Sequence, residues 1–287
     1  MNAQSPLGIR IPLTVVDIKD AGAYVDADVY GNLFVPHSQL PADLKIGDKL
    51  EVFLYHDGGR VLATAKKPYL ELGMVGALRV NSIECGTAYL DLGIPKELVV
   101  PVSEQRGYFE TGTYVLIYVA IDDDGRLFGT QRFSRYLSDV APAHTYASGD
   151  EVTIVPLART PLGLRVAADD QYFGLIYRTE LKQPLTLGKR MRAYILQQRE
   201  DGKLDLGLQR PGRGGVEQAA DEIWQLLQRA QGQLPFGDKS DPEEIEDYLH
   251  ISKGKFKKAI GALYKQRLIE IYDDKIVLVN NDKQDKA

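Results

Sequence analysis

The sequence predicts a mainly β protein in which three tandem five-stranded barrels precede a small C-terminal α+β domain. Three observations lead to this fold class. One residue pattern recurs three times at a period of about 65 to 75 residues, which is the size of a small complete domain. Each copy contains short apolar runs that are followed by Asp-Gly turns. Near residue 216 the apolar period lengthens from that of a strand to that of a helix.

A fixed spacing defines the three copies. A glycine lies eleven residues after one reference position in each copy, and a Tyr or Arg lies twelve residues before it. The reference positions are Pro36, Pro101 and Tyr177, the glycines are Gly47, Gly112 and Gly188, and the earlier residues are Tyr24, Tyr89 and Arg165. Equal spacing of this kind indicates equivalent modules, which we place at residues 8–67, 71–136 and 149–211.

Each module contains enough strands for a closed barrel. In the first module, strands are predicted at Leu13–Ile18 and Tyr24–Val29, and a third at Lys49–Tyr55 precedes the Asp57-Gly58-Gly59 turn. The runs that correspond to the third strand are Tyr114–Val119 and Arg190–Leu196, each followed by its own Asp-Gly turn. About five strands with little helix predict a small closed barrel of the oligonucleotide-binding (OB) kind.

The last quarter of the chain predicts a winged helix at residues 216–280. The expected helices are Val216–Gln231, a helix opened by Ser240 or Asp241 with Pro242 that runs through Leu249, and Lys253–Arg267 capped by Ser252. A hairpin of Leu268–Tyr272 and Lys275–Val279 follows them. Three helices and a two-stranded wing are typical of winged-helix domains. The segment RPGRGG at residues 210–215 is predicted to be an irregular linker.

Composition excludes several classes of protein. The single cysteine, Cys85, rules out a disulfide framework and a multi-cysteine zinc site, and it favours the reducing cytoplasm. We expect no membrane span and no secretory signal, because no apolar stretch approaches the length of a span and MNAQSPLGIR lacks the charged-then-apolar order of a signal. The four histidines form no pair at metal-ligand spacing, and no glycine-rich phosphate loop is present. We therefore expect a cytoplasmic, non-catalytic protein with no metal, no cofactor and no membrane association.

Positive charge is concentrated in two regions of a chain whose net charge is -5. The third module, with 10 basic and 8 acidic residues, is the only net positive one. Residues 252–269 contain six basic residues and no acidic one. These candidates for phosphate contact are Lys253, Lys255, Lys257, Lys258, Lys265 and Arg267. The alternative is that Lys257 and Lys258 form a solvated face paired with the acidic helix before it.

The third module combines aromatic and basic residues, as single-stranded nucleic-acid binders do. Tyr172, Phe173 and Tyr177 are among its aromatic residues, and they alternate with the basic residues Arg165, Arg178, Lys189, Arg190, Arg192 and Arg199. Exposed aromatic rings stack on bases, while basic side chains follow the phosphates. The alternative for each aromatic residue is packing in the barrel core.

Several segments resemble a known family. Gly22–Val25 followed by LFVPHSQL, and FGLIYRTEL followed by Gly188, resemble the S-one RNA-binding repeat. The whole chain resembles the conserved virulence factor B family of bacterial RNA-binding regulators, most closely in REDGKLDLGLQ, LPFGDKSDPEEI and SKGKFKKAIGALYK. The resemblance implies single-stranded RNA binding, with messenger RNA as the expected partner, and post-transcriptional regulation without catalysis. Carried over by position, it implies that Tyr24, Tyr89, Arg165 and Tyr177 contact RNA.

Two function classes follow from the sequence. The first is an RNA-binding post-transcriptional regulator that uses the third module and the winged helix. The second is a transcription regulator whose winged helix binds duplex DNA and whose barrels serve as protein-interaction modules. Competition between single-stranded RNA and duplex DNA separates these classes.

Overall fold

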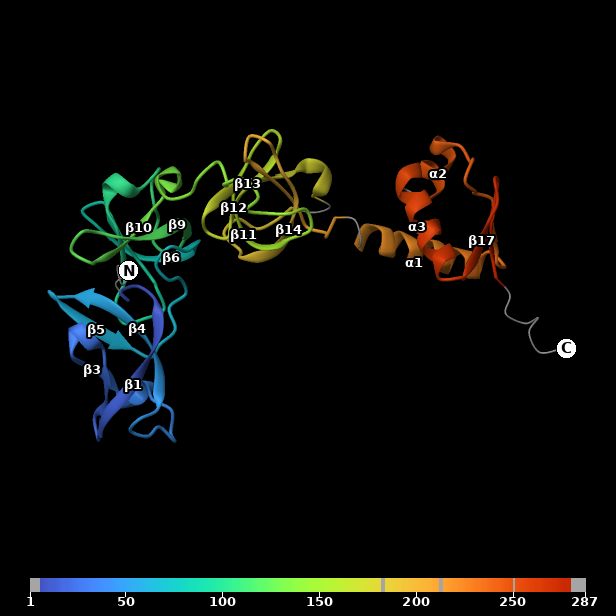
Figure 1. The fold of residues 1–287 in the computed structure, drawn as a ribbon. Helices are drawn as coiled ribbons and strands as arrows, with labels where there is room; N and C mark the ends of the chain where they lie inside the picture. Colours follow the sequence, from blue (N-terminus) through green and yellow to red (C-terminus); the bar gives the residue numbers. More distant parts are fainter. Residues whose placement is uncertain (1–5, 182–183, 212–213, 250, 280–287) are drawn as a thin grey trace. The chain divides into compact units, whose positions relative to one another are not determined.

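The computed structural model describes residues 6–181, 184–211, 214–249 and 251–279 of the chain (Figure 1). It confirms the predicted fold class, because three five-stranded modules precede a small C-terminal domain of helices and short strands. The chain divides into two compact units, and the second contains residues 144–151, 193–198 and everything from Leu206 onward. In the described part of the chain, no helix is both long and apolar enough to cross a membrane.

The first barrel consists of strands β1 to β5 in the order β3-β2-β1-β4-β5. Their bounds are β1 Arg10–Lys19, β2 Gly22–Asp26, β3 Asn32–Pro36, β4 Lys49–Asp57 and β5 Arg60–Thr64. Strands β3 and β5 lie side by side without a hydrogen-bonded ladder, so this barrel is nearly closed. The strand predicted at Tyr24–Val29 is too long, because a 3-10 turn at Asp28–Tyr30 begins after Asp26. Asp28 has a positive φ of 51°, which ends the extended backbone.

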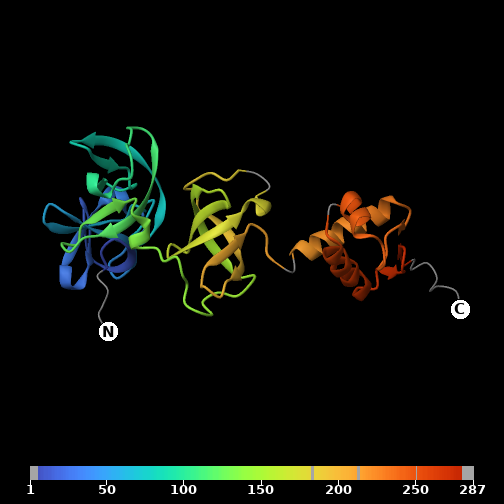
Figure 2. The ribbon, with the colours of Figure 1, turned by 90° about the horizontal axis from the view of Figure 1, so that it is seen from above.

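The second and third barrels are closed. The second consists of β6 Val75–Glu84, β7 Thr87–Leu90, β8 Leu98–Val100, β9 Tyr114–Ile121 and β10 Leu127–Thr130. The third consists of β11 Glu151–Arg159, β12 Gly163–Ala168, β13 Tyr172–Tyr177, β14 Met191–Gln198 and β15 Leu204–Gly207. Both follow the connectivity of the first barrel, with the third and fifth strands now paired. Figure 2 shows the third barrel as a small, strongly curled sheet.

Equivalent irregularities support the equivalence of the three modules. The ladder between the first two strands of each barrel is interrupted at the same place, after Val15, Val80 and Pro156. A 3-10 turn also follows the third strand each time, at His37–Gln39, Val102–Glu104 and Arg178–Glu180. Because bulges re-aim side chains, their repetition places Tyr24, Tyr89 and Arg165 at matching positions on the second strand.

The C-terminal domain has its own hydrophobic core. It contains α1 Gly214–Arg229, β16 Gln233–Leu234, α2 Pro242–Leu249, α3 Lys253–Lys265, β17 Ile269–Ile271 and β18 Ile276–Leu278. The predicted caps are present, since Asp241 accepts a hydrogen bond from the Glu243 amide and Ser252 accepts one from the Lys255 amide. The core includes Ile223, Leu227, Phe256, Ile260 and Leu263. Three helices with a β17–β18 wing agree with a winged helix.

Two details of this domain differ from the sequence prediction. Helix α1 begins at Gly214, so the irregular linker is shorter than the predicted 210–215, and Gly212 and Arg213 lie outside the described residues. Strand β16 was not expected, and it pairs with β18 to give a three-stranded sheet. A two-residue strand has no detectable period of its own, because its position comes from pairing with β18.

Candidate nucleic-acid interface

The third barrel contains a hollow of about 530 Å³ on the face formed by β12, β13 and β15. We call it the third-barrel hollow. Four residues singled out from the sequence line it: Arg165, Phe173, Tyr177 and Arg199. All of its lining residues belong to the first compact unit of the chain. These four residues, which the repeat pattern and the charge of the third module singled out, therefore lie on one concave surface.

Tyr177 is held in the hollow by a chain of polar contacts. Its hydroxyl accepts a hydrogen bond from Nη2 of Arg199. The Asp205 carboxylate in turn accepts two hydrogen bonds from Arg199, at 2.8 Å from Nε and 2.7 Å from Nη2. These hydrogen bonds raise the pKa of Arg199, so its guanidinium stays charged. The half-buried Tyr177 ring is thus oriented before any ligand arrives, which lowers the entropic cost of binding.

Arg165 covers Phe173 at the other side of the hollow. The guanidinium carbon of Arg165 lies 3.7 Å from the Phe173 ring centroid, and its Nη2 donates to Oδ1 of Asp139 at 2.9 Å. Phe173 itself is only 7% exposed. Its ring therefore serves as a support, and the flat surface that faces outward at this point is the Arg165 guanidinium. Arginine planes stack on bases as aromatic rings do.

The hollow offers both kinds of contact that a single strand requires. Leu162, Leu175 and Leu204 add apolar surface, and Lys203 adds a third cation beside Arg165 and Arg199. The Arg165–Asp139 pair is solvent-exposed, and such pairs contribute at most about 1 kcal/mol. Arg165 can therefore exchange Asp139 for a phosphate with little loss of free energy. The arrangement suits a base placed against Tyr177 with its phosphates near the cations.

Three further arginines predicted as contacts do not line the hollow. Arg190 forms two hydrogen bonds with Asp170, both 2.8 Å, and donates to the Val75 carbonyl oxygen at 2.9 Å. Its guanidinium therefore supports the contact between the second and third barrels within the first unit. Arg178 begins the 3-10 turn after β13, and Arg192 lies on β14, both with exposed side chains.

The first barrel presents an aromatic pair on the face that is equivalent to the third-barrel hollow. Tyr24 lies opposite Phe34 in the β2–β3 ladder, with ring centroids 5.4 Å apart. The Lys19 ammonium lies 5.1 Å from the Tyr24 ring centroid. Phe34 is 39% exposed, so its ring is accessible to a base. The sequence reasoning missed Phe34, although it stands two residues before Pro36, as Leu175 stands two residues before Tyr177.

The second barrel lacks this arrangement. Tyr89 lies opposite Val99, which replaces Phe34. The hollow on this face, also about 530 Å³, is lined partly by the β4–β5 turn of the first barrel. From that turn Asp57 pairs with Lys96, whose hydrogen bond lowers the pKa of Asp57 and keeps a negative charge there. A carboxylate at this place disfavours a phosphate.

The predicted basic residues of the winged helix lie mainly on the outer face of α3. Lys257, Lys258 and Lys265 are exposed, as is Arg267 just beyond the helix, whereas Lys253 and Lys255 are half-buried. Lys257 forms an ion pair of 2.9 Å with Asp238. Asp238 precedes α2, so this carboxylate does not belong to that helix. Within the described residues, no ion pair involves the other five. The alternative in which Lys258 pairs with the acidic helix is thus not found there.

Comparisons with known proteins agree with this architecture. A model of the S1 domain matches residues 7–66, and a model described as a CvfB-like winged helix domain matches residues 221–278. Conserved virulence factor B from Staphylococcus aureus strain USA300 is 27% identical over 243 residues, which covers 82% of this chain and 81% of that protein. The predicted resemblance to the conserved virulence factor B family is confirmed. Conserved virulence factor B from the bovine strain RF122 shows the same identity and coverage.

One solved structure also aligns with most of this chain. It is a multidomain protein with nucleic acid binding domains from Streptococcus pneumoniae TIGR4. The two chains are 24% identical, and the alignment covers 96% of this chain and 99% of the other, with a TM-score of 0.40.

Several residues of the hollow were missed by the sequence reasoning. Asp205 follows Arg199 across the Asp201-Gly202 turn, so the hairpin pattern contained a signal for this pair. Asp139 lies in the segment between the second and third modules, for which the repeat gave no expectation. Leu162 is 64% exposed, and an exposed leucine beside a turn is unremarkable in a sequence. No group of three or more His, Cys, Asp or Glu side chains suited to a metal occurs among the described residues.

Proposed function

We propose that this protein is a non-catalytic, cytoplasmic post-transcriptional regulator that binds single-stranded RNA, messenger RNA in particular. The third-barrel hollow carries the proposal, because it places an oriented Tyr177 ring, the Arg165 plane and further cations on one concave face. The similarity to S1 domains and to conserved virulence factor B supports the same role.

The shape of the hollow favours a single strand over a duplex. Stacking on Tyr177 needs a base whose flat face is accessible, and the bases of a duplex are stacked on each other. The Tyr24–Phe34 pair of the first barrel is a second surface of this kind. The proposed contacts of the winged helix are electrostatic, through the exposed lysines of α3.

A DNA-binding transcription regulator is the second candidate function. The observation that favours it is the row of exposed lysines on α3, since the third helix of a winged-helix domain can enter the major groove. In that case the barrels serve as protein-interaction modules, and the third-barrel hollow is not used for nucleic acid.

Replacing Arg165 with alanine tests the proposed phosphate contact in the hollow. We expect a plot of log affinity for single-stranded RNA against log salt concentration to become less steep by about 0.7, because one phosphate contact to a single strand is lost. Arg159→Ala is the matched control, since Arg159 is exposed on β11 of the same barrel but does not line the hollow. Equal slopes for Arg165→Ala and the parent protein would contradict the assignment.

A further inference from the structure

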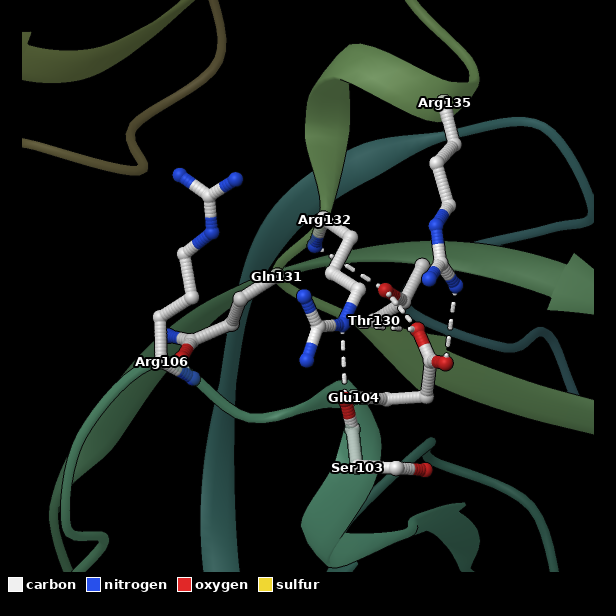
Figure 3. A network of polar contacts seen from close by, with 7 residues as sticks. All are labelled: Ser103, Glu104, Arg106, Thr130, Gln131, Arg132 and Arg135. Atoms are coloured by element: carbon white, nitrogen blue, oxygen red, sulfur yellow. Dashed lines mark hydrogen bonds and ion pairs between the residues drawn. The ribbon is translucent and has the colours of Figure 1, made fainter.

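The second barrel carries a group of arginines that neither the repeat pattern nor the third-barrel hollow accounts for. Arg132 and Arg135 pair with the Glu104 carboxylate near the end of β10, and Arg106 lies on the neighbouring loop (Figure 3). Glu104 accepts hydrogen bonds from Thr130 Oγ1 at 2.6 Å and from Nη1 of Arg135 at 3.0 Å. We call Arg106, Arg132, Arg135 and the nearby Tyr108 the second-barrel patch.

The hydrogen bond between Glu104 and Thr130 belongs to the shared barrel framework. In the first barrel, Gln39 accepts the same bond from Thr64 Oγ1 at 2.7 Å. A neutral amide is therefore sufficient to hold the buried threonine. Arg106 and Tyr108 are additions of the second barrel relative to the first, which has Pro41 and Asp43 at their positions, whereas Arg132 corresponds to the basic residue Lys66.

The arginines have binding capacity that the fold does not use. Arg132 donates from Nε to the Ser103 carbonyl oxygen at 2.6 Å, and Arg135 uses Nη1 for Glu104. A guanidinium has five N–H donors, so most remain available. Arg106 is exposed, and among the described residues its guanidinium has no polar partner; in Figure 3 it extends away from the network. Arg132 and Arg135 pair with one carboxylate and Arg106 adds a third positive charge, so the group is net positive.

A fully exposed aromatic side chain lies on the same loop as Arg106. Tyr108 is two residues from Arg106 and is the most exposed large apolar or aromatic side chain described. The loop that carries both is anchored at two points. Gln105 Nε2 donates to the Gly86 and Val100 carbonyl oxygens at 2.8 and 2.9 Å, and the Arg106 amide donates to Gln131 Oε1 at 2.6 Å. Anchoring reduces the ordering cost of binding.

We infer that the second-barrel patch is an additional RNA-binding site, in which the arginines contact phosphates and Tyr108 stacks on a base. The inference rests on the proposed function, since it assigns a further contact to the same ligand. It also assigns an RNA-contacting role to the second barrel. The face of this barrel that is equivalent to the third-barrel hollow is lined by the Asp57–Lys96 pair. The site lies on the β8–β9 connection and the end of β10.

The test uses the full-length protein and a fluorescein-labelled single-stranded RNA of about 30 nucleotides, because one OB fold covers about 4 to 16. The variant Arg106→Gln/Tyr108→Ser changes two exposed side chains, so it should melt with the parent protein. We expect its Kd to rise about 5-fold or more and the salt slope to fall by about 0.7.

Arg79→Gln/Tyr114→Ser is the matched control. Arg79 and Tyr114 are an exposed Arg and Tyr paired across β6 and β9 of the same barrel, so the control removes the same groups elsewhere. It should bind like the parent protein. If the parent binds RNA and the patch variant binds as tightly as the control, the patch is refuted while the proposed function stands. If the parent binds no RNA, both are refuted.

Discussion

Replacing Tyr177 with alanine should weaken binding of single-stranded RNA about 5- to 150-fold, which corresponds to about 1 to 3 kcal/mol for one lost stacking contact. The salt dependence should hardly change, because stacking releases no counterions. Fluorescence anisotropy at several salt concentrations measures both quantities. The Tyr177 ring is half-buried and its hydroxyl accepts from Arg199, so melting temperatures must accompany the affinities.

Tyr177→Phe is the matched control for this prediction. It retains the ring and loses only the hydroxyl that Arg199 contacts. We expect its affinity to stay within a few fold of the parent value, since a typical hydrogen bond contributes about 0.5 to 1.5 kcal/mol. A folded Tyr177→Ala protein that binds RNA as tightly as the parent would remove Tyr177 from the site.

Replacing Phe256 with alanine should unfold the C-terminal domain selectively. Phe256 is completely buried on α3 within a core built only from residues of that domain. Loss of a buried phenylalanine costs about 3 to 5 kcal/mol, which should lower the melting temperature of so small a domain by more than about 10 °C. Calorimetry should show one shifted transition, while the transition of the barrels stays in place.

Tyr264→Ala separates packing from the loss of an aromatic ring in that helix. Tyr264 also lies on α3 but is 57% exposed, so this substitution should change stability by less than about 0.5 kcal/mol. Equal melting temperatures for Phe256→Ala and Tyr264→Ala would show that the C-terminal core is wrongly assigned.

Much of the fold could be predicted from the sequence because the chain repeats its own signals. Asp-Gly turns and apolar runs located the strands of three modules, and capping residues located α2 and α3. Errors arose where backbone geometry or tertiary pairing decides the outcome. A positive φ at Asp28 shortened β2, and pairing with β18 created β16. The boundaries of the domains stay predictions.

The candidate site could be predicted only in part. The repeat identified Arg165 and Tyr177, which do line one hollow. It could not show that Phe173 is buried beneath Arg165 or that Arg190 is engaged by Asp170, because both depend on side-chain packing that the repeat spacing does not specify. The second-barrel patch was missed for a different reason. Counted over the whole module, 6 basic residues stand against 9 acidic ones, and such an average conceals a local group of arginines.

Competition between unlabelled single-stranded RNA and duplex DNA for the full-length protein tests the central claim most directly. A labelled single-stranded RNA is bound first, and each competitor is then added at matched nucleotide concentration and fixed salt. The third-barrel hollow predicts that single-stranded RNA displaces the label at much lower concentration than duplex DNA, because only a single strand offers a free base face to Tyr177. Displacement by duplex DNA at lower concentration than by single-stranded RNA would contradict the proposal and favour a DNA-binding regulator that uses α3.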